Sequence, residues 1–313
     1  MIVTVTANPA LDKTAELGRL CPGELNRLRS LVLDAGGKGV NVSKMIAALG
    51  GFSLATGFVG GGSGKELIRI LAERGISSDF VKVGAVTRTN LKILDCGARL
   101  TELNEPGIQV TDTEARLLTR KLAALAKPGA VFVLSGSLCG GVGTDFYARL
   151  IHGIHRKGGR AFLDADGEAF RAALAEKPDF IKPNLRELAE YFGIRGELPL
   201  DVSRELCRRL AEKGIPKLAL SMGRDGALFV SGREAFYAPG LDVEARSPVG
   251  AGDCLVGAFA YATDRGEAWE EAAALAMAAS AGAVTTVGTK PPSRQLVDQL
   301  RGEVKFEALG AGR

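Results

Sequence analysis

The sequence predicts an α/β protein with a mostly parallel central sheet, helices on both faces of that sheet, and a small separate β-sheet. Apolar strand-like runs alternate with helical runs along most of the 313 residues, a pattern typical of parallel sheets covered by helices. Two segments, residues 12–36 and 88–106, break this alternation with short alternating runs and no long helix. We therefore predict an α/β core formed by residues 1–11, 37–87 and 107–313, and a β lid formed by residues 12–36 and 88–106.

The individual elements follow from hydrophobic periodicity and from the glycines that end helical runs. Strand-like runs occupy residues 2–7, 53–59, 130–136, 160–165, 179–183 and 217–223. Helical spacing occupies residues 40–50, 64–75, 114–129, 145–159, 184–193 and 203–214, and the apolar run after residue 253. Two alternating runs flank DCGAR within residues 88–106, which predicts a hairpin. Ligands bind beyond the carboxyl ends of strands in such sheets, so a lid beside that edge would cover a site.

The composition excludes several classes of protein. Hydrophobic residues make up 46% of the chain and charged residues 24%, which is typical of a globular protein with a full core. The net charge of +4 is spread along the chain, so we expect no nucleic-acid partner, although an anionic small substrate would fit. We expect no signal peptide and no membrane span. Five scattered cysteines without a C-x-x-C motif favour a reduced, cytoplasmic location over disulfides or a zinc site.

The stretch SPVGAGDCLVGAF, residues 247–259, places one acid between a run of small residues and an apolar helix. Gly250, Ala251 and Gly252 leave three successive backbone N–H groups accessible at the start of that helix, and such a nest stabilises negative charge. Asp253 beside the nest can accept a proton from a hydroxyl. A capping role for Asp253 would not require the preceding small residues, so the stretch favours phosphoryl transfer to an alcohol.

Polar residues near other strand ends allow both a structural and a functional interpretation. Asp12, in NPALDKT, could cap a turn or accept a hydrogen bond from a sugar hydroxyl. The glycines around Gly37 let the backbone approach a ligand, and a helix starts directly after them. A tight turn would explain these glycines but not Lys38 and Asn41 beside them.

Two stretches further along the chain also remain open between structure and binding. Asn184 and Glu187 have the spacing of a capping box, and they could equally hold the water shell of a metal ion. After the next apolar strand, a hairpin turn would explain Ser221, Gly223 and Gly226, and so would contacts with nucleotide phosphates.

Two segments, AGGKGVNVSKMIAALGG and SPVGAGDCLVGAF, resemble the signature segments of the ribokinase-like (phosphofructokinase B) family of carbohydrate kinases. NPALD, TRTNLKI, SGSL, KPNLRE and SMGRDGA match the family in the same order, so the resemblance covers nearly the whole chain. TVTANPALD, AGGKGVN and TELNEPG are most similar to the 1-phosphofructokinase branch, and the tagatose-6-phosphate kinase branch is similar in most of these motifs. The resemblance implies a ribokinase-like three-layer sandwich with a β-sheet lid.

The resemblance also implies a role for each matching residue. Asp253 would be the catalytic base, with Gly250, Ala251 and Gly252 as the anion hole. The sugar hydroxyls would lie near Asp12, Gly37, Lys38 and Asn41, and the phosphate already on the sugar near Arg27, Arg88, Lys92 and Ser137. The nucleotide would lie near Asn184, Ser221, Gly223 and Gly226, with Glu187 and Asp164 near its metal ion. Cys254 departs from the serine usual at its position.

The activity implied is the phosphorylation of a ketohexose phosphate by ATP with Mg²⁺, first of all fructose 1-phosphate to fructose 1,6-bisphosphate. Tagatose 6-phosphate and fructose 6-phosphate are alternative substrates. A non-catalytic sugar-phosphate sensor would have no need of the intact GAGD, and a nucleoside kinase would not explain Arg27, Arg88 and Lys92. A small exposed lid sheet needs covering, which predicts a homodimer through the lid.

Overall fold

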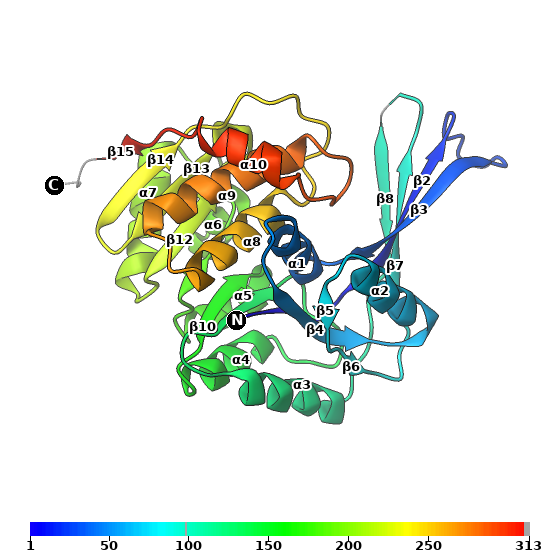
Figure 1. The fold of residues 1–313 in the computed structure, drawn as a ribbon, viewed down its shortest axis with the longest axis horizontal. Coiled ribbons are helices and arrows are strands. Elements are labelled where there is room, and N and C mark those ends of the chain that lie inside the picture. The colour runs from blue at the N-terminus through cyan, green and yellow to red at the C-terminus, as the bar shows by residue number, and fades with distance from the viewer. Residues whose placement is uncertain (98, 310–313) are drawn as a thin grey trace.

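A long, mostly parallel sheet forms the middle layer of the computed structural model, which describes residues 1–97 and 99–309 (Figure 1). Its strands, in spatial order, are β15 (Glu307–Ala308), β14 (Glu234–Ala238), β13 (Ala227–Ser231), β12 (Lys217–Ser221), β11 (Phe180–Ile181), β10 (Arg160–Asp164), β9 (Val131–Ser135), β1 (Ile2–Thr6), β4 (Ser53–Val59) and β5 (Ser77–Ser78), and β6 (Val81–Lys82) also pairs with β4. The strands from β12 to β5 pair in parallel, whereas β13, β14 and β15 are antiparallel. Every residue of β1 and β9 is buried, as expected for strands covered on both faces.

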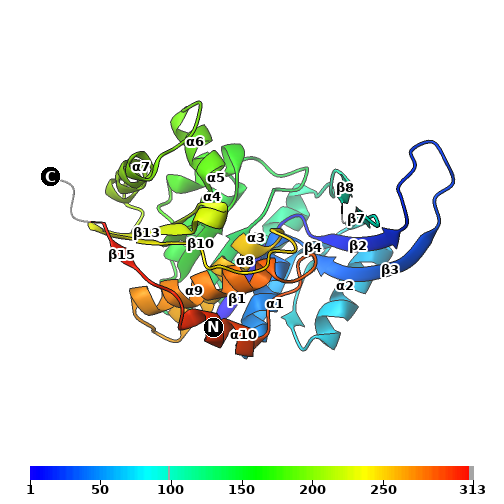
Figure 2. The same cartoon turned by 90° about the horizontal axis from the view of Figure 1, so that it is seen from above.

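Helices cover both faces of this sheet (Figure 2). One layer contains α3 (Asp112–Leu125), α4 (Phe146–His155), α5 (Gly167–Leu174), α6 (Leu185–Phe192) and α7 (Leu200–Glu212). The other contains α1 (Lys38–Ala48), α8 (Ala251–Asp264), α9 (Trp269–Val284) and α10 (Arg294–Arg301), with α2 (Gly61–Glu73) in a smaller cluster beside α1. Each layer has its own buried apolar cluster, so the α/β sandwich predicted from the sequence is confirmed.

A separate four-stranded sheet projects from one side of the core (Figure 1). Its order is β3 (Leu28–Gly36), β2 (Ala10–Leu17), β7 (Arg88–Leu94) and β8 (Leu100–Asn104). Residues from the two segments predicted to leave the core thus pair with each other, and β7 and β8 form the predicted hairpin. Residue 98 in this hairpin, and residues 310–313 of the predicted core, lie outside the described residues. We call this sheet the lid; its division from the core as a domain stays a prediction.

Several elements had no clear signal in the sequence. The helices α5, α9 and α10 were not predicted, nor were the antiparallel strands β14 and β15 at one edge of the sheet. The helix α9 is rich in alanine, and its small buried side chains pack closely against α8, so it lacks the usual amphipathic period. Among the described residues, no helix has the length and apolar character needed to cross a membrane.

Candidate active site

Two cavities lie on either side of the N-terminus of α8. The lid cavity, of about 340 Å³, lies between the lid and the core. Its lining includes Asn8, Asp12, Gly37, Lys38, Asn41, Arg88, Asn90, Lys92, Ser137, Gly250 and Asp253. The apolar cavity, of about 580 Å³, is lined among others by Asn184, Ser221, Gly223, Gly226, Leu241, Val243, Ala251, Gly252, Leu255 and Met277. Residues 250–253 therefore contribute to the walls of both cavities, where two ligands could meet.

The start of α8 has the geometry of an anion site. Gly250 is the N-cap residue and has a φ of 85°, a left-handed conformation that favours glycine. The first N–H groups of a helix have no partner within the helix, and they carry partial positive charge. A Cβ added to Gly252 would lie 3.3 Å from the Nζ atom of Lys182, so glycine lets this ammonium group lie close to the backbone. Backbone dipoles and an ammonium group together make this end of α8 suited to phosphate.

Asp253, in the first turn of α8, is a buried carboxylate with properties suited to a base. Its Oδ2 atom accepts a hydrogen bond of 2.7 Å from Nδ2 of Asn41 on α1. Burial first of all, and then the negative charge of Asp164, raise the pKa of Asp253 to about 6, although Asn41, Lys38 and Lys182 act in the opposite direction. At neutral pH the carboxylate is therefore ionised but more basic than a free aspartate, as a proton acceptor requires.

Asp164, the last residue of β10, holds two lysines beside Asp253. Its Oδ1 atom lies 3.3 Å from Nζ of Lys38 and 3.5 Å from Nζ of Lys182. Burial raises the pKa of Asp164, but the ammonium groups of Lys182 and Lys38 outweigh burial and hold the pKa below its usual range. Lys38 lines the lid cavity, and its pKa is raised chiefly by Asp164. Lys38 thus stays charged next to the start of α8.

The lid contributes a row of polar side chains to the lid cavity. Arg88, Asn90 and Lys92 are spaced two residues apart along β7, so they share one face of the strand, and all three line this cavity. Asp12 of β2 accepts hydrogen bonds from Asn90 Nδ2 at 3.0 Å and from Lys92 Nζ at 2.8 Å. Asp12 thus supplies a counter-ion to Lys92 from within the lid.

Unpaired polar atoms remain beside this row. Arg88 donates to the backbone oxygen of Asn8 at 3.1 Å, but its Nε atom is buried without a hydrogen-bond partner. The Oδ1 atoms of Asn8 and Asn90 are likewise buried and unpaired. Buried polar atoms are normally paired, so these three are suited to a polar ligand that the lid cavity would hold.

Asn184 and Glu187 form the capping box that the spacing allowed. Asn184 Oδ1 accepts from the backbone N–H of Glu187 at 2.8 Å, and Glu187 Oε2 accepts from that of Asn184 at 3.0 Å. Asn184 also lines the apolar cavity. Two ammonium groups share the Oδ1 atom of Asp164, whereas its Oδ2 atom is buried without a hydrogen-bond partner, so a place for Asp164 near a metal ion stays a prediction. The described residues contain no cluster of three His, Cys, Asp or Glu that could hold a metal ion.

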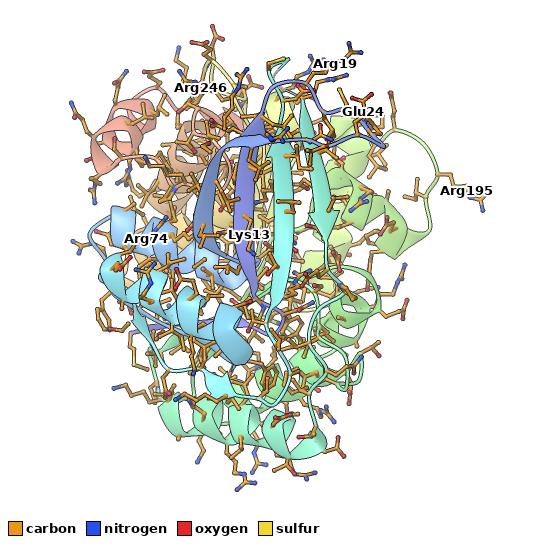
Figure 3. All side chains as sticks on the ribbon, turned by 90° about the vertical axis from the view of Figure 1, so that its right-hand side faces the viewer. Lys13, Arg19, Glu24, Arg74, Arg195 and Arg246 are labelled. Carbon is orange, nitrogen blue, oxygen red and sulfur yellow. The ribbon has the colours of Figure 1, made fainter. Side chains whose placement is uncertain are left out.

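All but three of the site residues proposed from the sequence line one of the two cavities. Glu187 and Asp164 line neither cavity but contact Asn184 and Lys38, which do. Arg27 is exposed in the connection between β2 and β3, and it lines neither cavity. This connection lies at the outer end of the lid, where Figure 3 labels Arg19 and Glu24. Sequence reasoning missed Asn8, Lys44 and Lys182. The position of Lys182, directly after a short apolar strand and within the matched KPNLRE motif, was the available signal.

Known proteins that are similar to this chain belong to a family of carbohydrate kinases. The model of the pfkB family of carbohydrate kinases matches residues 5–296. A 1-phosphofructokinase of Rhodobacter capsulatus is 37% identical over 98% of both chains, and one of Vibrio cholerae is 32% identical over 98% of this chain and 97% of the other. The structure of phosphofructokinase-2 from Escherichia coli in complex with potassium superposes with a TM-score of 0.92 at 30% identity, covering 96% of this chain and 98% of the other.

Proposed function

This chain belongs to the pfkB family of carbohydrate kinases, as its motifs predicted, and on this basis we propose that it converts fructose 1-phosphate and ATP into fructose 1,6-bisphosphate and ADP. The observation that carries the proposal is the position of residues 250–253 between a polar cavity and an apolar one. A sugar phosphate in one cavity and a nucleotide in the other would meet at the buried carboxylate of Asp253. The 1-phosphofructokinases among the relatives, similar over the whole chain, support this choice of substrate.

Asp253 accepts the proton of the attacking sugar hydroxyl in the mechanism that we propose. The hydroxyl oxygen forms a bond to the γ-phosphorus of ATP, and the bond from that phosphorus to the β–γ bridging oxygen breaks, which releases ADP. The N–H groups at the start of α8, with Lys38 and Lys182, stabilise the negative charge on the transferred group. Asp164 holds both lysines in place through its Oδ1 atom.

The nucleotide occupies the apolar cavity in this proposal. Leu241, Val243 and Met277 offer an apolar surface to the base, and Ser221, Gly223 and Gly226 lie on the phosphate side with Asn184. Mg²⁺ bound to the nucleotide would neutralise phosphate charge and usually keeps several of its water ligands. Glu187 uses Oε2 in its capping box, which leaves Oε1 to accept a hydrogen bond from such a water.

The sugar phosphate occupies the lid cavity. Asp12, Asn41 and the backbone at Gly37 are placed to hold hydroxyl groups, and Arg88 and Ser137 to hold the existing phosphate. Arginine binds phosphate with two parallel hydrogen bonds, so the unpaired Nε atom of Arg88 suits this role. Lys92 adds positive charge while it stays paired with Asp12.

A panel of ketohexose phosphates tests the proposal. We expect kcat/KM with ATP to be highest for fructose 1-phosphate, compared with fructose 6-phosphate and tagatose 6-phosphate in the same assay. The similarity to phosphofructokinase-2 makes fructose 6-phosphate the second candidate. A higher kcat/KM for either 6-phosphate would contradict the choice of substrate, and binding of sugar phosphates without turnover would support a sensor instead.

We further propose that the protein is a homodimer in the cytoplasm. The lid exposes large apolar side chains on both of its edge strands, namely Leu28, Leu31, Val32, Leu33, Leu100 and Leu103. Lid-to-lid contact would cover them. Light scattering should give the mass of a dimer for the native chain and of a monomer for Leu31→Asp, and a native monomer would contradict the proposal.

For the proposed location in the cytoplasm, the five free cysteines fit a reducing compartment, which cell fractionation would test.

A further inference from the structure

Lys44, on the second turn of α1, is a buried lysine that the mechanism above does not use. Its side chain is 1% exposed, and it lines neither cavity. Its Nζ atom donates to Asp34 Oδ2 at 2.9 Å and to Asn41 Oδ1 at 3.3 Å. A buried ammonium group is tolerated only when its charge and hydrogen bonds are satisfied, so these contacts hold its position.

The contact with Asn41 determines which end of that amide faces the base. An ammonium group only donates hydrogen bonds, so it requires the amide oxygen of Asn41. The amide nitrogen is then left to donate to Asp253 Oδ2 at 2.7 Å. The reversed amide would place its oxygen against the carboxylate and its NH₂ group against the ammonium group. Lys44 therefore excludes the reversed orientation.

Asp34 brings the lid into the same set of contacts. It lies near the end of β3, whereas Lys44 and Asn41 belong to the core helix α1. Its Oδ1 atom pairs with Arg74, which follows α2 and is labelled beside the lid in Figure 3. A continuous chain of polar contacts thus runs from β3 of the lid through Lys44 and Asn41 to Asp253.

We propose that Lys44 is a positioning residue that fixes the Asn41 amide toward Asp253, and that Asp34 of the lid holds Lys44 in place. This inference rests on the proposed role of Asp253 as the base. The hydrogen bond from Asn41 stabilises the ionised carboxylate, which is the form that accepts a proton. Displacement of β3 from α1 would release Lys44 and then the amide, so the position of the lid and the state of the base are linked.

A double-mutant cycle on kcat tests whether Lys44 acts through Asn41. Lys44→Met in the native chain should lower kcat about tenfold, as for a lost hydrogen bond to a charged group, and should move the acid limb of the kcat profile to higher pH. In an Asn41→Ala background the same change should alter kcat by less than about twofold. Asp164, Lys38 and Lys182 also act on Asp253, and they are unchanged in all these variants.

Arg74→Met is the matched control. It removes the other partner of Asp34 but leaves the pair with Lys44, so kcat and its pH profile should stay as in the native chain. If Lys44→Met does not fold, Lys44→Met combined with Asp34→Asn removes the buried ammonium group together with the charge of its partly exposed partner, and should fold with the same shift of the acid limb.

Two results would overturn the inference. One is an equal loss of kcat in the native and Asn41→Ala backgrounds, which would mean that Lys44 acts on the structure in general. The other is an unchanged acid limb in every folded Lys44→Met variant. Normal turnover of Asp253→Asn would instead remove the premise, so the two failures can be told apart.

Discussion

Replacement of Asp253 by Asn should make the protein more stable while it removes activity. The side chain is 7% exposed, and its pKa is raised from 3.8 to about 6 in the folded protein, first of all by burial. The folded state therefore binds the proton more tightly than the unfolded state does. Above pH 6 the folded protein must hold a buried charge, and this unfavourable contribution disappears as the pH falls from about 6 to about 4.

The size of the change in stability follows from the shift in the pKa of Asp253. A change of about 2 pKa units, at 1.36 kcal/mol per unit, corresponds to about 3 kcal/mol. Asp253→Asn has a similar shape without the charge, so its free energy of unfolding at pH 8 should exceed that of the native chain by up to about 3 kcal/mol. The difference should vanish near pH 4. Such a gain in stability at the expense of activity is common for buried catalytic groups.

Urea unfolding at pH 8 and at pH 4 measures the stability difference, and a coupled assay for ADP measures turnover. We expect kcat to fall by ~10²–10⁴-fold, because the variant cannot accept a proton. Binding of ATP should be largely retained, which calorimetry can check. Near-normal turnover would refute the assignment of the base. A variant that is less stable than the native chain at pH 8 would refute the account of its buried charge.

Three further predictions follow from the same site. For the native chain, kcat should fall about tenfold for each pH unit below 6. Because the charge of Asp164 raises the pKa of Asp253, Asp164→Asn should move this acid limb of the kcat profile to lower pH. An identical acid limb in the native chain and the variant would contradict this. Arg88→Ala should lower kcat/KM for the sugar phosphate by an amount equivalent to roughly 2–5 kcal/mol and leave the KM for ATP unchanged. The control Lys13→Ala, which removes a lid cation outside the lid cavity, should change neither quantity. If Arg88→Ala instead loses affinity for ATP, Arg88 lies at the nucleotide. Hydrogen exchange in residues 10–36 and 88–104 should slow when sugar phosphate binds, because the lid closes over it, and unchanged protection in both segments would mean that they form no lid.

The elements of the fold that the sequence predicted were those with a local signal. Apolar runs ending in polar residues marked the parallel strands, and glycines marked the ends of the helices. Residues 250–253 were recognisable as a candidate anion site because a nest of N–H groups at a helix start depends on neighbouring residues alone. Other motifs that resemble the family, such as NPALD and KPNLRE, then suggested which residues face residues 250–253 across the site. By contrast, α9 is buried on several sides and so lacks an amphipathic period, and its hydrophobic pattern therefore did not predict a helix.

The partners of the charged groups were decided only by the tertiary structure. Lys92 meets Asp12, Asp164 meets both Lys38 and Lys182, and Asn41 meets Asp253 across 212 positions of the chain. No local pattern encodes such pairs, because they arise when strands β2 and β7, or helices α1 and α8, pack side by side. The energy of a buried charge depends on those neighbours. The local stretch GAGD could therefore identify Asp253 as a candidate base, but only the folded protein, by burying it beside Asp164 and Asn41, sets its pKa and its orientation.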